Sequence, residues 1–435
     1  MISNFKEKFL QPGFQRYFRN TSWLFVGKLI NLIVAFGVNI MIARYLGPSQ
    51  FGLLNYVISF VGLFAFIPGF GVSSVISRDL VKYPDRKELI MGTAFFLNLI
   101  GSILAVILIT LIVSFNFNHD KFANLLIVIM GLTFIFQSFS VIEIFFQASV
   151  LAKKIVIVQI IGLLVSSIIK ILFVGLKFDL QYFIYLYVFD AAFISAGALL
   201  VYRLNHYSIF NWRIDKNTAK ELLKESWPLM FSVLFFAIYA RIDQVMIKSL
   251  LNNHEVGIYS VAVKLSEFWV FIPSTIIASL MPAIINARTT DPVVYNNRLK
   301  KIYFIIFYLS IFISLVIFIL SKPIVLALFG YSYLDAISPL RIYVWSGVAS
   351  SVGYLVTMYL ILESRTKITL FCAFLSMITN VGLNLLLIPA VGISGAAVAT
   401  LISYFLFIFS IGVFKVTRGH LMFIFKSLIP EFKKI

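Results

Sequence analysis

The chain has 435 residues, of which 61% are hydrophobic and only 12% are charged. A soluble protein of this length could not bury so much apolar surface, so the composition excludes a soluble globular protein and indicates many membrane-spanning helices. A net charge of +18 can indicate a nucleic-acid partner, but Lys and Arg also concentrate on the cytoplasmic side of membrane proteins, and we expect no nucleic acid here.

Twelve apolar segments are long enough to span a bilayer. In chain order they cover residues 22–43, 52–77, 90–114, 122–150, 155–176, 182–202, 226–249, 257–286, 302–320, 338–362, 368–388 and 393–414. The first has no cleavage-like end and many others follow it, so we expect a span rather than a signal peptide. The sequence therefore predicts an all-α polytopic membrane protein with about 12 transmembrane helices.

These segments and the regions between them divide the chain into five parts. Residues 1–20 are a basic, amphipathic cytoplasmic start, 21–203 hold the first six segments, and 204–225 form a cytoplasmic loop. Residues 226–416 hold the last six segments, and 417–435 form a basic tail. We expect the tail to be an interfacial helix rather than a further span.

The charges of the loops predict the orientation. Of the 36 Lys and Arg residues, 26 lie at the two ends and in the loops after even-numbered segments, whereas five lie in the loops after odd-numbered segments. The positive-inside rule then places both termini in the cytoplasm.

Reporter fusions test this orientation. Fusions after Tyr83 and Asn211 should give a cytoplasmic signal, and fusions near Pro48 and Tyr331 should give a periplasmic one, because they fall in loops of opposite charge. A periplasmic signal at Asn211 would contradict an arrangement of six plus six segments.

The two halves of the chain carry similar short sequences at a constant offset. The offset is 205 residues in each case: Asn39-Ile-Met-Ile resembles Gln244-Val-Met-Ile, Phe66-Ile-Pro68 recurs as Phe271-Ile-Pro273, and Gly52 corresponds to Gly257. This indicates a duplicated unit of six segments, and so two six-helix lobes related by a pseudo-twofold axis along the membrane normal. Pro68 and Pro273 should then both kink or unwind their helices at similar depth.

Polar and charged side chains inside the segments are the candidates for a binding site. A charge at membrane depth costs about 2.5–3.5 kcal/mol on insertion scales and normally faces a bundle interior or a wet cavity. Polar residues that share one face of the second segment suit either cavity lining or close helix packing. The candidate substrate-binding residues are Lys28, Asn31, Asn39, Asn55, Ser59, Lys170, Arg241, Lys264 and Arg341.

Carboxylates accompany these cations. The candidates for ion coupling or charge balance are Glu143, Asp190, Asp243 and Glu267. Arg241 and Asp243 are two residues apart, about 200° around a helix, so they face different ways. Lys264 and Glu267, spaced i, i+3, could pair with each other. Each charge could equally belong to a structural ion pair, and Arg341 could extend to the interface.

The sequence offers no catalytic site. Gly27-Lys28 lacks the upstream Gly and the following Ser or Thr of a phosphate-binding loop, and no HExxH or paired-Cys metal spacing occurs. Cys372 is the one cysteine, so an intrachain disulfide is excluded. We expect no enzyme activity, no metal and no cofactor, and any net drive would come from a gradient of substrate, H⁺ or Na⁺.

Three stretches resemble one family. They are Arg44-Tyr-Leu-Gly-Pro-Ser-Gln-Phe-Gly52, Arg241-Ile-Asp-Gln-Val-Met246, and Asn384-Leu-Leu-Leu-Ile-Pro389 followed by Gly392-Ile-Ser-Gly-Ala-Ala-Val-Ala-Thr400. In this order, and with this number of segments, they resemble the polysaccharide-export flippases of the Wzx type, which carry O-antigen and related units. The resemblance spans the whole chain.

The resemblance implies the fold of the multidrug/oligosaccharidyl-lipid/polysaccharide (MOP) exporter superfamily, in which one lobe rocks against the other. It implies transport of undecaprenyl-pyrophosphate-linked oligosaccharide from the cytoplasmic to the periplasmic leaflet of the bacterial inner membrane. The implied partners are this lipid-linked oligosaccharide, membrane lipids, an O-antigen polymerase and a chain-length regulator. Arg241 and Asp243 match the family pattern by position, whereas the other candidates depend on the argument from helix faces.

Two alternatives stay open. A related antiporter that exports cationic drugs would favour a net acidic lumen, whereas five intramembrane bases here accompany four acids. A membrane polysaccharide polymerase would carry a large outer loop, whereas all the outer loops here are short.

Overall fold

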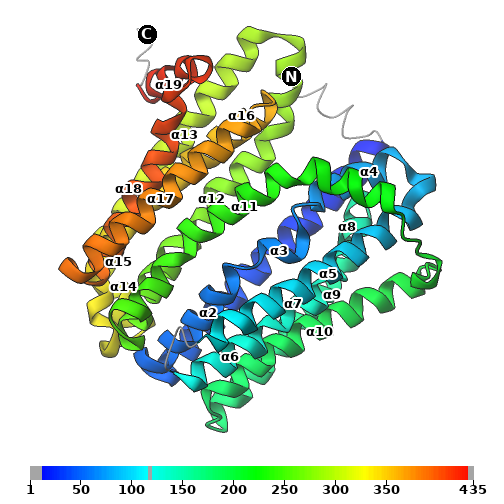
Figure 1. Ribbon diagram of the computed structural model, residues 1–435. Helices are drawn as coiled ribbons and strands as arrows, with labels where there is room; N and C mark the ends of the chain where they lie inside the picture. Colours follow the sequence, from blue (N-terminus) through cyan, green and yellow to red (C-terminus); the bar gives the residue numbers. More distant parts are fainter. Residues whose placement is uncertain (1–11, 116–119, 430–435) are drawn as a thin grey trace. The chain divides into compact units, whose positions relative to one another are not determined.

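The computed structural model describes residues 12–115 and 120–429. Within them the ordered elements are all helices, with no strand (Figure 1). The predicted basic start at residues 1–20 falls largely outside this range, as does the end of the predicted tail after residue 429. The all-α fold predicted from composition is confirmed.

The helices account for the predicted spans. Among the described residues, ten helical runs are long and apolar enough to cross a membrane, or up to eleven if the bent pair Tyr331–Tyr343 and Ser346–Leu362 is one span. The first run, Ser22–Lys82, has 61 residues and covers the first two predicted segments. Each of the twelve predicted segments therefore lies on helix, and the protein is a multi-pass membrane protein.

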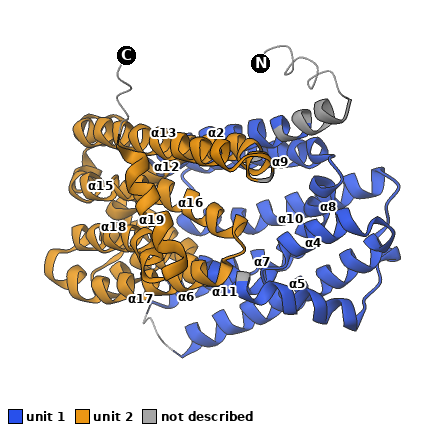
Figure 2. Ribbon diagram, turned by 90° about the horizontal axis from the view of Figure 1, so that it is seen from above, with its two compact units in different colours: residues 1–45, 61–233 blue, residues 46–60, 234–435 orange. Residues whose placement is uncertain are grey.

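The chain divides into two compact units, coloured in Figure 2. Unit 1 holds residues 1–45 and 61–233, and unit 2 holds residues 46–60 and 234–435. Two helices contribute to both units: α2 (Pro12–Gly62) and α11 (Lys216–Leu250). The short stretch 46–60 is notable because its sequence belongs to the first half of the chain but it packs with the second.

Unit 1 is a helical bundle. Besides its parts of α2 and α11 it contains α3 (Phe66–Gly69), α4 (Ser73–Lys82), η1 (Pro84–Arg86), α5 (Lys87–Ser114), α6 (Lys121–Gly131), α7 (Thr133–Gln137), α8 (Ser140–Ala148), α9 (Ala152–Gly175), α10 (Leu180–Leu204) and η2 (Ile209–Asn211). Ile76, Met91, Phe146 and Tyr202 are among the buried side chains of its core. Close packing of these large side chains holds α4, α5, α8 and α10 together.

Helix α11 begins inside the segment predicted as a loop between the halves. The Asp215 carboxylate accepts hydrogen bonds from the backbone N–H and the hydroxyl of Thr218, both at 2.7 Å, so it caps the helix from Lys216 onward. These hydrogen bonds favour the ionised form and lower the pKa of Asp215 below its ordinary value. The loop proper is therefore only residues 205–215.

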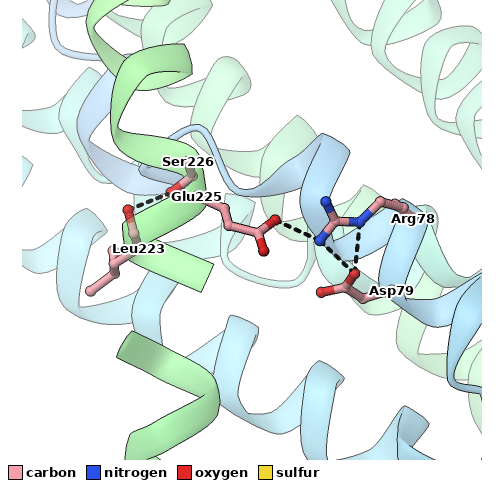
Figure 3. A network of polar contacts seen from close by, with 5 residues as sticks. All are labelled: Arg78, Asp79, Leu223, Glu225 and Ser226. Carbon is pink, nitrogen blue, oxygen red and sulfur yellow. Dashed lines mark hydrogen bonds and ion pairs between the residues drawn. The ribbon is translucent and has the colours of Figure 1, made fainter. Parts of the chain in front are cut away.

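An ion pair joins the first part of α11 to α4 within unit 1 (Figure 3). The Arg78 guanidinium lies 2.6 Å from a Glu225 oxygen and 2.8 Å from an Asp79 oxygen. Two turns before Arg78, a Cβ on Gly71 would lie 2.7 Å from the Met230 nitrogen of α11, so only glycine fits there, and its φ of 68° also favours glycine. Because Arg78 and Glu225 are each at least half exposed, their pairing orients the helices and adds at most about 1 kcal/mol of stability.

Unit 2 is the second bundle. Besides its parts of α2 and α11 it contains α12 (Asn253–Thr290), α13 (Pro292–Ile319), α14 (Ser321–Leu328), η3 (Tyr331–Ala336), α15 (Ile337–Tyr343), α16 (Ser346–Leu362), α17 (Thr366–Val391), α18 (Ile393–Ser410), η4 (Ile411–Val413) and α19 (Lys415–Leu428). Ile277, Tyr303, Val356, Cys372 and Ile411 are among the side chains of its core.

The two repeat-related prolines do not behave alike. Pro68 lies in the four-residue helix α3, and Phe70 and Gly71 beyond it have positive φ, so the helix breaks as predicted. Helix α12 instead runs through Pro273 without interruption, so it does not unwind there as the chain does at Pro68. Gly69 and Gly71 follow Pro68, whereas Ser274 and Ile276 stand at the equivalent positions after Pro273 and do not favour positive φ.

The tail forms the predicted helix, α19, and His420 anchors it. The His420 ring stacks on Tyr359 with a centroid separation of 3.4 Å and an interplanar angle of 2°. Its Nε2 lies 3.0 Å from the Tyr303 hydroxyl. The side chain is 7% exposed, and because burial disfavours the charged imidazolium, it lowers the pKa of His420 to about 3.

Acidification should therefore release α19 from unit 2. Above the ordinary His420 pKa of 6.5 the side chain is neutral whether or not α19 is docked, so its contribution to docking is fully present. This contribution is lost as the pH falls from 6.5 toward 3, because His420 takes up a proton only when α19 is undocked. The undocked fraction should rise by about tenfold per pH unit in that range. Limited proteolysis of α19 at pH 7.5 and pH 5 measures the undocked fraction. His420→Phe, which keeps an aromatic ring, should remove the pH dependence of cleavage. Equal cleavage of the native protein at both pH values would contradict this role of His420.

Candidate functional site

A polar cluster lies among the membrane-spanning helices of unit 2. Its members come from α11, α12, α17 and α18, and they are Arg241, Asp243, Gln244, Tyr259, Ser260, Lys264, Glu267, Asn380, Asn384 and Thr400. Polar groups at this depth are costly unless they are hydrogen-bonded or paired. We refer to these ten residues as the unit 2 polar cluster.

Arg241 and Glu267 form the accessible part of the cluster. An Arg241 Nη lies 3.5 Å from a Glu267 Oε, and the two side chains are 42% and 39% exposed. The prediction allowed Glu267 to pair with Lys264 on its own helix, but its ion-pair partner in the structure is Arg241 of the neighbouring helix. Arg241 thus keeps much of its guanidinium open to a ligand.

Lys264 is the second cation of the cluster. Its ammonium lies 5.8 Å from the centre of the Phe51 ring, in the range of a cation–π contact. It also lies within electrostatic reach of Arg241 and Glu267. Two bases and one acid therefore give this part of the cluster one net positive charge.

Asp243 faces the other way, as its spacing from Arg241 predicts. Its side chain is 1% exposed. One carboxylate oxygen accepts hydrogen bonds from the Tyr259 hydroxyl at 2.5 Å and from the Thr400 hydroxyl at 3.5 Å, and the other accepts from the Gln244 N–H at 2.8 Å. All three donors are neutral, so the carboxylate is enclosed without a cation in contact among the described residues.

Two asparagines of α17 continue this network. Asn380 donates to the Thr400 hydroxyl at 3.5 Å and accepts from Asn384 at 3.0 Å. Both side chains are fully buried, and the Asn384 Oδ1 has no hydrogen-bond partner among the described residues. A buried carbonyl oxygen without a donor is a group that a cation or a protonated carboxyl could satisfy.

The predicted polar face of the second segment is closed rather than open. Ser59 is 2% exposed and donates to the Gln244 Oε1 at 2.7 Å, and Ser260 donates to the same atom at 3.4 Å. Asn55 is 4% exposed and donates to the Phe51 carbonyl of its own helix at 2.7 Å. In this structure Ser59 and Ser260 join helices of unit 2 through Gln244, Asn55 satisfies its own helix, and Asn55 and Ser59 are buried.

Unit 1 holds two smaller polar groups. Lys170 and Asp190 lie 3.5 Å apart, Ser166 donates to Asp190 at 2.7 Å, and the Lys170 ammonium lies over the Tyr187 ring. Elsewhere, Glu143 accepts a hydrogen bond from Gln159 at 3.0 Å. The predicted cation Lys170 and carboxylate Asp190 are thus joined in one ion pair.

The candidates on the first segment belong to unit 1. Lys28 and Asn31 are exposed, and Asn39 donates to the Ala35 carbonyl of its own helix at 2.8 Å.

Arg341 lies at another place in unit 2. Its Nε donates to the Ser321 hydroxyl at 2.9 Å and its guanidinium lies 5.6 Å from the Phe318 ring centre. It lines an open cavity of about 800 Å³ together with Glu255 and Asp335. The structure therefore separates Arg341 from the cluster with which it was grouped by charge.

Sequence reasoning missed four neutral members of the cluster as site residues: Tyr259, Asn380, Asn384 and Thr400. Asn384 and Thr400 stand inside the stretch that resembles the flippase family, and Asn380 precedes Asn384 by one helical turn. Two amides on one face of an otherwise apolar segment were the available signal. Among the described residues, no three His, Cys, Asp or Glu side chains gather as a metal site.

Curated relatives include archaeal proteins. The uncharacterized membrane protein MJ1375 of Methanocaldococcus jannaschii is 28% identical over 51% of this chain and 54% of its own length. The probable flippase AglR of Haloferax volcanii is 30% identical over 38% of this chain and 35% of its own. The matched region thus spans about half of the first relative and about a third of the second.

Solved structures share the fold. An inward-facing multidrug resistance MATE family transporter of the MOP superfamily covers 92% of this chain and 96% of its own, with a TM-score of 0.71 and 16% identity. The lipid II flippase MurJ covers 94% of this chain and 91% of its own, with a TM-score of 0.70 and 14% identity. Identities this low establish a common fold and nothing more.

The family model described as polysaccharide biosynthesis protein matches residues 17–288. This range includes the seventh and eighth segments, and so Arg241, Asp243, Lys264 and Glu267 of the unit 2 polar cluster. The chain belongs to this family of polysaccharide biosynthesis proteins and has the fold of the MOP exporter superfamily.

Proposed function

We propose that the protein is a flippase that moves a pyrophosphate-linked oligosaccharide on a polyprenyl carrier from the cytoplasmic to the outer leaflet. The observation that supports this most is the accessible Arg241 guanidinium beside Lys264 in the membrane-spanning part of unit 2. Arginine and lysine donate charge-assisted hydrogen bonds to phosphate oxygens. An O-antigen-type repeat unit on undecaprenyl pyrophosphate is the specific substrate that we propose, with an O-antigen polymerase and a chain-length regulator acting after it.

A multidrug antiporter is the second candidate, because MATE transporters share the fold. Such a protein selects cationic drugs, and the positive charges of Arg241 and Lys264 would repel them. Glu267, the acid nearest to these bases, is already paired with Arg241. The charge of the site therefore favours an anionic substrate.

Asp243 is the group that we propose for coupling to H⁺ or Na⁺. A carboxylate whose direct hydrogen-bond donors are all neutral is expensive to keep ionised, because it has left water without a cation in contact. A proton or a small cation would neutralise it. The Thr400 hydroxyl and the amide oxygens of Asn380 and Asn384 supply the hard oxygen atoms that alkali cations prefer.

Deletion of the gene in the native host tests the function. The lipid-linked oligosaccharide should accumulate in the cytoplasmic leaflet, where an impermeant sugar-modifying enzyme cannot reach it from outside. Expression of the native protein should restore the surface polysaccharide, and the susceptibility to cationic drugs should stay unchanged. A strain that accumulates no intermediate and becomes drug-sensitive would instead support the antiporter.

A further inference from the structure

Two glycines that occupy equivalent places in the repeat contact each other within unit 2. A Cβ built on Gly52 would lie 1.7 Å from the Asn253 carbonyl oxygen and 2.7 Å from the Gly257 nitrogen. A Cβ built on Gly257 would lie 1.9 Å from the Pro48 carbonyl oxygen and 3.1 Å from the Gly52 nitrogen. No side chain fits at either place, so α2 and α12 cross here backbone against backbone.

The contact is symmetric. Gly52 and Gly257 are 205 residues apart, and so are their partners Pro48 and Asn253. Each glycine thus meets the carbonyl of the residue four places before the other glycine, as in an isologous interface. Small residues permit such close crossings in membranes, where each carbonyl that approaches a glycine Cα contributes a weak C–H···O contact.

The side chains beside the crossing are sealed from solvent. On α2, Phe51, Asn55 and Ser59 follow at helical spacing and are 0%, 4% and 2% exposed. Phe51 packs edge-on against Tyr333 with ring centres 6.2 Å apart. The Gln244 amide oxygen is the one acceptor that receives both Ser59 and Ser260, so a single side chain secures the seam beyond the glycines.

The crossing lies where the chain turns between predicted segments. Gly52 follows Gly47, whose backbone interrupts α2, and Gly257 lies in the second turn of α12. The predicted loops before both glycines carry few Lys and Arg residues and are expected on the outer side. An oligosaccharide that leaves on that side needs the segment 46–60 to separate from α12. At the glycines, separation breaks only backbone contacts, because no side chains interdigitate there.

We propose that Gly52 and Gly257 form the outer gate of the protein, closed in this structure, with Gln244 as its side-chain latch. The purpose of the gate rests on the proposed flippase function, whereas its opening and closing do not. An alanine at either glycine places a methyl group against a backbone carbonyl that cannot rotate away. The closed gate is therefore destabilised and the buried face of α2 becomes accessible from outside.

Cysteine accessibility tests the gate independently of substrate. In a protein with Cys372→Ser, the reporter Asn55→Cys should react slowly with a membrane-impermeant maleimide added outside the cells. Adding Gly257→Ala or Gly52→Ala should raise that rate by about tenfold or more, as expected for a loss of about 1.4 kcal/mol or more of closed-state stability. Gly37→Ala and Gly382→Ala are matched controls, because a Cβ at either place meets no atom within 4 Å, and they should leave the rate unchanged.

A second variant tests the gate if the alanine variants do not fold. Gln244→Leu removes the latch without a clash and should also raise the labelling rate, by a smaller factor. Unchanged labelling in a folded Gly257→Ala protein, or in Gln244→Leu if the former is absent from the membrane, overturns the gate. The proposed function fails separately, when deletion of the gene leaves the lipid-linked intermediate unaffected.

Discussion

Asp243→Asn should abolish ion-driven transport while the protein still reaches the membrane in normal amount. Asparagine has nearly the same shape and keeps an oxygen that can accept from Tyr259 and Thr400, so the packing of α11 against α12 and α18 survives. It cannot take up a proton or offer a negative charge to a cation. The chemistry of coupling is removed with little change in structure.

The measurement is uptake of labelled substrate into inverted vesicles under an imposed Na⁺ or pH gradient. Native protein should respond to one of the two gradients, whereas Asp243→Asn should respond to neither, with an initial rate reduced by about a hundredfold if coupling contributes roughly 3 kcal/mol. Asp335→Asn is the matched control, because this carboxylate is exposed and its charge stays hydrated. A gradient response in Asp243→Asn equal to that of the native protein would remove Asp243 from coupling.

Lys264→Ala and Arg241→Ala should each lower export by about tenfold to a hundredfold at normal protein levels. Each substitution removes one charge-assisted hydrogen bond to a phosphate group, worth about 1.5–3 kcal/mol. Lys264→Arg should retain more activity than Lys264→Ala, because the positive charge near Phe51 is kept. If Lys264 acted only through packing, Lys264→Arg and Lys264→Ala would both lose activity.

Complementation of the deletion strain, with surface polysaccharide and membrane protein quantified together, measures these effects. Lys367→Ala is the control, because this lysine is exposed at the start of α17. Glu267→Gln separates two roles of this carboxylate. The variant should be tolerated if Glu267 only balances the charge of Arg241. It should stop transport if Glu267 is also needed for the empty protein to return to its starting conformation. Full activity of both Lys264→Ala and Arg241→Ala would show that these residues have a structural role and do not bind the substrate.

The sequence alone determined the membrane spans. Their hydrophobicity depends on composition over about 20 residues, which is a local property that tertiary packing does not alter. The spacing of Arg241 and Asp243 was also sufficient to predict that they face different ways, since a helix fixes that angle. The constant offset of 205 residues is likewise sufficient to pair Gly52 with Gly257.

Only the tertiary structure decided which groups meet. Periodicity gives the face on which Glu267 lies but not the neighbouring helix, so its pairing with Arg241 rather than Lys264 could not be read from the sequence. Asn55 satisfies its own helix and Ser59 donates to Gln244, because close crossing of α2 and α12 buries that face. Tyr259 and Thr400 surround Asp243 from two other helices, and contacts between segments so far apart in the chain are set by packing, which a linear pattern does not contain.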